Sequence, residues 1–342
     1  MPAYFETGMF AHEAAWHGMG NVVDFYPGTW KEARKLAELN WDAVAAPAYE
    51  FSGLDSKGKI TWDAEVAVSG AYRAMTGKQR IVRNDTGATI GVPGINYEII
   101  DHNAIGEIVE ALNTDPNVKY ETLVVLEGGA HIVAVIRLDE PRQIQSGRKK
   151  DSSLTLPYVA LSTRHDGTGA CKALATSVRI VCANTARAAD WEAEGNGTVF
   201  TFRHARSWRE RIPEAQQALA GARSAFHDYV DFAEHMMTVK FGDLDIERFL
   251  ELWMPIGVAG DSKRRVQTVL DARGTYLNIL NSDTCAGIVG TGYGAYQAAT
   301  EWADHYAHPG ASQDSYVTRQ LIDTSRVKRS AARYIRELSA IA

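Results

Sequence analysis

The pattern of apolar and polar positions is most informative between residues 154 and 190. Residues 154–163 are mostly apolar, aromatic or β-branched, which predicts a strand. The RHDGTG turn that follows (164–169) holds two glycines that can adopt positive φ, and residues 170–175 predict the returning strand. After Ser177, the side chains at positions 178, 181, 182, 185 and 189, mostly apolar, share one helical face. The stretch therefore predicts a β-hairpin followed by a helix over 177–190.

A second hairpin is predicted upstream, where Gly128-Gly129 separates the apolar segments 120–127 and 130–138. Helical spacing predicts one helix over Thr29–Asn40 and another that begins near Asp101 and runs to Leu112. Between the two hairpins, residues 145–153 are rich in Gly, Ser and Lys and predict a mobile basic loop. Short strands are expected at 48–52, 64–68, 71–75, 79–83, 89–92, 97–100 and 198–203.

Helical periodicity dominates the chain after Ser207. Helices are expected at 207–239, 245–254, 261–280, 291–307 and 315–341. The element order predicts an α+β fold with an antiparallel β-sheet, in which two β-hairpins and one α-helix form the core, followed by a helical C-terminal region. We expect an α+β core domain over residues 1–205 and a helical region with a basic tail over 206–342.

Composition places the chain among soluble globular proteins, with 45% hydrophobic and 23% charged residues. No run approaches the roughly 20 apolar residues of a membrane-spanning helix, and no cleavable leader pattern begins the sequence. The three cysteines are odd in number and lack the spacing of a metal site. We therefore expect no membrane partner and a location in a reducing host cytoplasm.

The net charge of −6 taken alone argues against a nucleic-acid partner, but the charge is unevenly distributed. Residues 137–187 carry nine basic and four acidic side chains, and residues 311–342 carry six and three. Local fields rather than net charge attract a polyanion, so the central unit and the tail are candidate contact surfaces. The alternative is that both are ordinary solvated faces.

Long basic side chains and aromatic residues gather around the central hairpin, the combination that sequence-tolerant binding of single strands requires. The aromatic candidates are Tyr158, Trp191, Phe200, Phe202 and Trp208, near Arg203, Arg206, Arg209 and Arg211. Core packing is the alternative role for each aromatic residue. The residues that we predict to bind DNA are Arg164, His165, Lys172, Arg179, Arg187, Lys149, Lys150 and Arg203.

The residues give less support to a catalytic nucleophile, a nucleotide-binding loop or a metal site. A Cys–His nucleophile would pair His165 with Cys171 or Cys182, but nothing in the sequence places a thiol beside the imidazole, and a buried structural cysteine is the alternative. The GTGYG segment (290–294) lacks the Lys-Ser/Thr of a phosphate-binding loop. One helix face presents Glu301, Asp304, His305 and His308. This spacing suits a metal or a polar helix face, and the sequence leaves both open. We predict no catalytic residue, metal or cofactor.

Several motifs resemble a family of phage and plasmid-like proteins known as a domain of unknown function. They are AWHGMG (15–20), RNDTG (83–87), TRHDGTGA (163–170), VRIVCANT (178–185) and YGAYQAATEWADH (293–305). One departure is Thr163-Arg164, where the family usually has Asn-Ser. The order hairpin, hairpin, helix also resembles the core of phage and eukaryotic Rad-type single-strand annealing proteins, a likeness of element order and not of residues.

The second resemblance implies an ATP-independent protein that binds and anneals single-stranded DNA in phage recombination. It also implies a homo-oligomeric ring or filament, with a phage exonuclease or a single-strand-binding protein as a further partner. Two alternatives stay open. One is a phage-encoded hydrolase or nucleotide-modifying enzyme that uses His165 and Asp166, and the other is a host-interaction protein with no nucleic-acid role.

Overall fold

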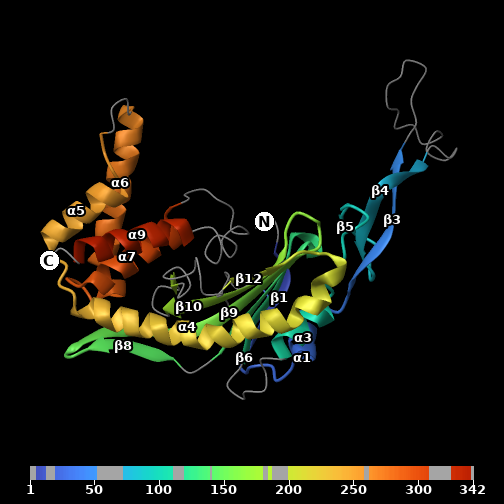
Figure 1. The fold of residues 1–342 in the computed structure, drawn as a ribbon, viewed down its shortest axis with the longest axis horizontal. Coiled ribbons are helices and arrows are strands. Elements are labelled where there is room, and N and C mark those ends of the chain that lie inside the picture. Colours follow the sequence, from blue (N-terminus) through green and yellow to red (C-terminus); the bar gives the residue numbers. More distant parts are fainter. Residues whose placement is uncertain are drawn as a thin grey trace.

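The protein folds into two antiparallel sheets and a helical C-terminal region, as seen in a computed structural model (Figure 1). The structure describes residues 5–12, 20–51, 72–110, 119–138, 141–179, 184–186, 199–257, 262–307 and 325–339. The predicted α+β class, the antiparallel sheet and the helical C-terminal region are confirmed. None of the helices in these ranges combines the length and apolarity needed to cross a bilayer.

The larger sheet, called the main sheet, has the strand order β11-β10-β9-β7-β6-β1-β2, with β8 pairing to β9 and β12 to β10. Its pairings are antiparallel except for the parallel pair β1–β2. The strands are β1 (Phe5–Ala11), β2 (Asn21–Val23), β6 (Lys119–Leu126), β7 (His131–Arg137), β8 (Arg142–Ser146), β9 (Lys149–Arg164), β10 (Cys171–Arg179), β11 (Asn184–Ala186) and β12 (Val199–Phe202). The β6–β7 and β9–β10 hairpins are those that the sequence predicts.

The smaller sheet consists of β3 (Ala43–Phe51), β4 (Tyr72–Arg83) and β5 (Thr89–Gly91). We call β3 and β4 the arm, because they extend away from the main sheet in Figure 1. The predicted strands at 71–75 and 79–83 are one continuous strand, β4. The prediction of a strand at 97–100 is wrong, because these residues form no strand. The expected strand at 64–68 lies outside the described residues.

Two short helices cover one face of the main sheet and enclose the first core. They are α1 (Trp30–Leu36) and α3 (His102–Glu110). Thr29 caps α1 by accepting a hydrogen bond from Glu32 N–H, and Asp101 caps the next helix by accepting from Ala104 N–H at 2.8 Å. The helices approach closely, because a Cβ at Gly106 would lie 2.3 Å from the Trp30 ring. Trp30, Leu123, Ile136 and Leu161 belong to this core.

A long helix, α4 (Ile212–Thr238), crosses beside β8, β9, β10 and β12 and leads into the C-terminal region (Figure 1). Pro213 lies in its first turn, where the missing N–H breaks no helical hydrogen bond. A second core joins α4 to Ile144 of β8 and to the later helices. These are α5 (Asp243–Trp253), α6 (Lys263–Leu280), α7 (Gly292–His305) and α9 (Ser325–Ser339).

Two predictions about the central stretch are wrong. Residues 177–179 continue strand β10, with Val178 opposite Leu156, and residues 184–186 form β11, so no helix begins at Ser177. The helix that packs on the sheet after the second hairpin is α4. Residues 145–153 are not a loop: they form the end of β8, a turn at Gly147 and the beginning of β9.

Candidate functional site

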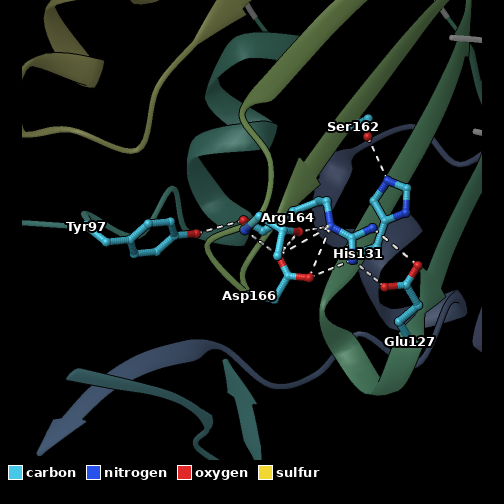
Figure 2. Close-up of polar contacts among 7 residues, drawn as sticks. Tyr97, Glu127, His131, Ser162, Arg164 and Asp166 are labelled. Carbon is cyan, nitrogen blue, oxygen red and sulfur yellow. Dashed lines mark hydrogen bonds and ion pairs between the residues drawn. The ribbon is translucent and has the colours of Figure 1, made fainter. Parts of the chain in front are cut away.

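The turn after β9 holds a guanidinium between two carboxylates, an arrangement we call the Arg164 clasp (Figure 2). Arg164 donates to Asp166 at 2.6 Å from Nη2 and to Thr168 Oγ1 at 2.9 Å from Nε. On its other side, Arg164 Nη1 donates to Glu127 Oε1 at 3.2 Å, and Nη2 also contacts Glu127. Glu127 comes from the β6–β7 turn, where its φ is +55°. The clasp therefore joins the two hairpin turns.

Within the clasp, the positive charge of Arg164 is balanced by the carboxylates of Asp166 and Glu127. Burial alone raises the pKa of Asp166, but hydrogen bonds from Arg164 and Thr168 outweigh burial and lower that pKa to about 2. Burial lowers the pKa of Arg164, whereas its hydrogen bonds to Asp166 and Glu127 and their negative charges raise that pKa. The net shift is upward. One cation thus faces two carboxylates within the protein, so Arg164 brings no surplus positive charge to a phosphate.

Buried histidines lie behind the clasp. His165 is completely buried, and its ring centroid lies 5.2 Å from that of His102 and 6.5 Å from that of His204. His102 and His204 each donate from Nδ1 to a backbone carbonyl, of Trp41 at 2.9 Å and of Glu98 at 3.0 Å. Neither ring nitrogen of His165 has a hydrogen-bond partner among the described residues. Desolvation lowers the pKa of all three histidines, which favours neutral rings.

The clasp turn also joins the smaller sheet to the main sheet. A Cβ at Gly91, at the end of β5, would lie 2.4 Å from the Asp166 Cα atom, so only glycine allows this approach. Tyr97 Oη donates to the Arg164 carbonyl at 2.7 Å (Figure 2). Beside this contact, Arg83 of the RNDTG motif pairs with Asp85 at 2.8 Å and lies 4.3 Å from the Trp41 ring centroid. The TRHDGTGA motif thus meets Gly91 and Tyr97 at a joint between the sheets, called the sheet joint.

Exposed basic side chains lie instead on β8, the turn that follows it and the beginning of β9 (residues 142–150), a segment that we call the basic hairpin. Its side chains are Arg142, Arg148, Lys149 and Lys150, all exposed. Residues 142–150 contain no acidic residue, and none of the four side chains has a hydrogen-bond or ion-pair partner among the described residues. The hairpin is anchored from its other side by Ile144, which is buried against the C-terminal region, and by buried Asp151. It therefore presents four exposed cations from a packed base.

The eight residues predicted to bind DNA fall into different environments. Lys149 and Lys150 lie on the basic hairpin, and Arg203 is exposed just after β12. Lys172 is half-buried in β10 opposite Ser162. Arg164 is held in the clasp, and His165 is inaccessible to a ligand outside the protein. The Arg179 backbone pairs with Thr155 in the sheet, and Arg187 lies outside the described residues.

Arginines near β12 contact aromatic rings, as expected, but most also pair with acids. Arg209 lies 4.4 Å from the Trp208 ring centroid and Arg211 lies 4.8 Å from that of Phe200. Their acidic partners are Asp101 for Arg209 at 3.3 Å, Glu214 for Arg211 at 3.0 Å and Glu98 for Arg206 at 3.5 Å. Trp208 and Tyr158 are buried, so neither is an exposed platform for a base. Trp191 lies outside the described residues.

The candidate metal set on α7 is engaged in protein contacts. Asp304 forms a buried ion pair with Lys328 of α9 at 2.6 Å, and Glu301 accepts from Thr284 Oγ1 at 2.8 Å. His308 lies outside the described residues. Within the described ranges, no group of three or more His, Cys, Asp or Glu side chains has the geometry to hold a metal ion. Burial raises the pKa of the Cys171 thiol, which is the opposite of what a nucleophile requires.

Sequence reasoning missed Arg142, Arg148 and Glu127. The turn-forming Gly147 was available as a signal for the basic hairpin, but residues 149–153 are all polar and show no polar/apolar alternation that would predict a strand. No local signal links Glu127 to Arg164, because 37 residues separate them in the chain.

Together these features define an α+β protein with a two-sheet body, an internal clasp and an exposed cationic hairpin. A family model described as Domain of unknown function (DUF932) matches residues 89–334. The chain belongs to this family, which confirms the family expected from the motifs. No curated protein and no solved structure matched the chain.

Proposed function

We propose that the protein binds single-stranded DNA through the basic hairpin and promotes ATP-independent annealing of complementary strands. The observation that carries this proposal is the set of four exposed cations on Arg142, Arg148, Lys149 and Lys150, which have no ion-pair partner among the residues that the structure describes. Such side chains bind phosphates and release the counterions condensed on the nucleic acid. In an annealing reaction they would offset the repulsion between two strands, and base pairing would then drive duplex formation.

The fold supports this proposal by analogy. The analogy is limited to the two hairpins β6–β7 and β9–β10 and the later helix α4, since β8 lies between the hairpins and β11 and β12 precede the helix. The packing of the basic hairpin on the C-terminal region keeps its charges on a fixed scaffold. Arg203 and Lys172 are the next candidates for phosphate contacts. We further propose that several copies assemble in a ring or filament in the host cytoplasm, since one hairpin spans only a few nucleotides.

The direct test is a salt titration of binding to a labelled single-stranded oligonucleotide, followed by fluorescence anisotropy. For the variant Arg148→Ala/Lys149→Ala/Lys150→Ala we expect weaker binding to all sequences. The slope of log affinity against log salt should become shallower by roughly 2, since each single-strand phosphate contact contributes about 0.7. The matched control is Lys263→Ala/Arg264→Ala/Arg265→Ala, which removes equal charge from exposed positions at the beginning of α6.

Annealing is measured with two complementary oligonucleotides that carry a fluorescence donor and acceptor, without ATP. The wild type and the α6 control should accelerate annealing equally, and the hairpin variant should lose most of that acceleration. Wild-type protein that binds no single-stranded DNA would refute the proposal. Equal affinity of the hairpin variant and the wild type would place the binding surface elsewhere and would also refute it.

A further inference from the structure

The turn between β9 and β10 (residues 165–170) is exposed on its outer side but carries one completely buried side chain. Gly167 and Thr168 are exposed, whereas His165 has no exposed surface. The His165 N–H donates to the Ala130 carbonyl at 2.7 Å, and a Cβ at Gly167 would lie 2.7 Å from the Pro93 side chain. The His165 ring thus holds an exposed turn against the body of the protein, and we call it the His165 plug.

The interior gives this ring no hydrogen bond. Neither ring nitrogen of His165 has a partner among the described residues. The two neighbouring rings, His102 and His204, direct their Nδ1 protons to backbone carbonyls. A buried polar atom without a hydrogen bond costs free energy, because it has lost its contact with water. The closed position of the plug is therefore stabilised by packing around the ring and by contacts of the turn.

The charges around the plug disfavour a proton on it. The titratable and charged groups that face His165 are His102 of α3, His204 after β12, His131 of β7, and Asp166, Arg164 and Glu127 of the clasp. The Asp166 carboxylate is already bound by Arg164 at 2.6 Å and by Thr168 N–H at 2.9 Å. Burial and the neighbouring rings outweigh the attraction of Asp166, so the pKa of His165 lies well below its ordinary value.

The position of a protonated ring follows from these observations. Inside the protein an imidazolium would need acceptors for two N–H groups, and the structure offers neither ring nitrogen one among the described residues. In water both groups are solvated. The outward position is accessible because the turn is exposed, and because the β7–β9 and β9–β10 ladders that precede and follow it need not open.

We propose that the His165 plug is a proton-sensitive latch of the sheet joint, which releases when the ring takes up a proton and the turn swings outward. The movement withdraws Asp166 from its close approach to Gly91 and so loosens the contact between the two sheets. It is a local opening and not unfolding of the chain. This device is independent of DNA binding and goes beyond the proposed function.

Proton linkage sets the size of the effect. An exposed imidazole has a pKa of about 6.5, whereas the plugged ring stays neutral, so only the open form gains a proton as the pH falls. The equilibrium constant for opening should therefore rise about 25-fold between pH 7 and pH 5. The latch is closed most firmly above pH 7 and weakens below about pH 6.5.

Hydrogen–deuterium exchange of the full chain tests the latch. The His165 amide reports the opening, and its exchange is corrected for the intrinsic rate at pH 7, 6 and 5. The opening constant should show the 25-fold rise and should be equal with and without 0.5 M urea, since a local opening exposes little surface. The buried Ala295 amide, which donates to Thr291 at 3.1 Å in α7, reports unfolding of the C-terminal region and should stay more protected.

Three variants separate titration of the ring from loosening of the turn. His165→Met keeps a buried plug without a titratable group and should abolish the pH dependence. Gly167→Ala presses on Pro93 and should increase opening at every pH while the 25-fold ratio remains, which keeps the test available even if His165→Met does not fold. The matched control, His235→Gln, replaces an exposed histidine of α4 outside the cluster and should behave as the wild type.

Three results would overturn the inference. The first is opening of the turn that does not change with pH in the wild type or in Gly167→Ala. The second is an unchanged pH dependence in His165→Met. The third is exchange of the His165 and Ala295 amides at the same corrected rate at every pH, because the turn would then open only when the whole chain unfolds.

Discussion

Arg164 illustrates how a charged residue in a motif can act within the fold. Its guanidinium lies between Glu127 and Asp166, which leaves it no surplus charge for a ligand. For Arg164→Ala we expect a loss of roughly 1–3 kcal/mol of unfolding free energy, because two partly buried carboxylates lose their partner. Urea denaturation measures this loss. Affinity for single-stranded DNA, taken from the same anisotropy assay, should stay within about twofold of the wild type.

The control for this prediction is Arg206→Ala. The Arg206 side chain is 90% exposed and only 3.5 Å from Glu98, so its removal should change stability by less than about 0.5 kcal/mol. Arg164→Ala with wild-type stability and much weaker DNA binding would show that Arg164 contacts phosphate after all.

At this scale the sequence located the basic residues but could not assign their partners. Lys149 and Lys150 are exposed as a contact residue must be, whereas His165 is enclosed by two other histidines. The difference depends on tertiary contacts between segments far apart in the chain. The motif around Arg164 led us to predict a DNA contact. In the structure, Arg164 instead pairs with Glu127 and Asp166 at the sheet joint.

Several elements meet at the buried histidines, and their neutrality predicts how stability depends on pH. Burial lowers the pKa of His102, His131 and His204 from about 6.5 to about 4. The unfolded chain therefore binds more protons between these values, so stability is complete above pH 6.5 and falls as the pH decreases toward 4. Each histidine should contribute about 1.4 kcal/mol per pH unit.

Urea unfolding at pH 7, 6 and 5 tests this dependence. His204→Gln should make the slope shallower by the contribution of one histidine. His235→Gln, at an exposed position on α4, is the matched substitution away from the buried cluster. Equal stability at pH 7 and pH 5 would contradict the assignment of neutral, buried rings.

The contact between α7 and α9 depends on one buried ion pair, Asp304–Lys328, in which both side chains are fully buried. Lys328→Met should reduce the unfolding free energy by about 3–5 kcal/mol, because the buried Asp304 carboxylate loses its cationic partner. The double variant Lys328→Met/Asp304→Leu should recover most of this loss. Denaturation of the four proteins of the double-mutant cycle measures the coupling, and additive effects would show that the pair contributes little.

Most element types were predictable from the sequence. The helix expected over 177–190 was not one of them, and this error has a physical reason. Positions 178, 181, 182, 185 and 189 match a helical stripe, yet Val178 pairs with Leu156 in β10. Thr176 and Val178 are β-branched, and pairing with β9 satisfies the backbone groups of β10, so tertiary context overrides the helical spacing. Long helices such as α4 need no such context, because their stripes extend over many turns.

In the whole molecule, the sheet joint connects the smaller sheet, and with it the arm, to the main sheet. Gly91→Ala would place a Cβ 2.4 Å from Asp166, so the two sheets must separate locally. We expect the arm to become more sensitive to limited proteolysis and the protein to lose roughly 2 kcal/mol of stability, in the range of overpacked sites. Gly94→Ala is the control, because its Cβ would lie 3.9 Å from the nearest atom. Equal digestion of both variants would argue against the joint.

Strand β9 connects the two ends of this architecture. It begins at Lys149 on the basic hairpin and ends at Arg164 in the clasp, and its 16 residues span about 50 Å. From Thr155 onward it is hydrogen-bonded on both sides, to β10 and then also to β7. A force applied along β9 at Lys149 would load the ladders on both sides of residues 155–164 together in shear. The basic hairpin should therefore resist mechanical extraction from the sheet far better than a hairpin peeled open one pair at a time.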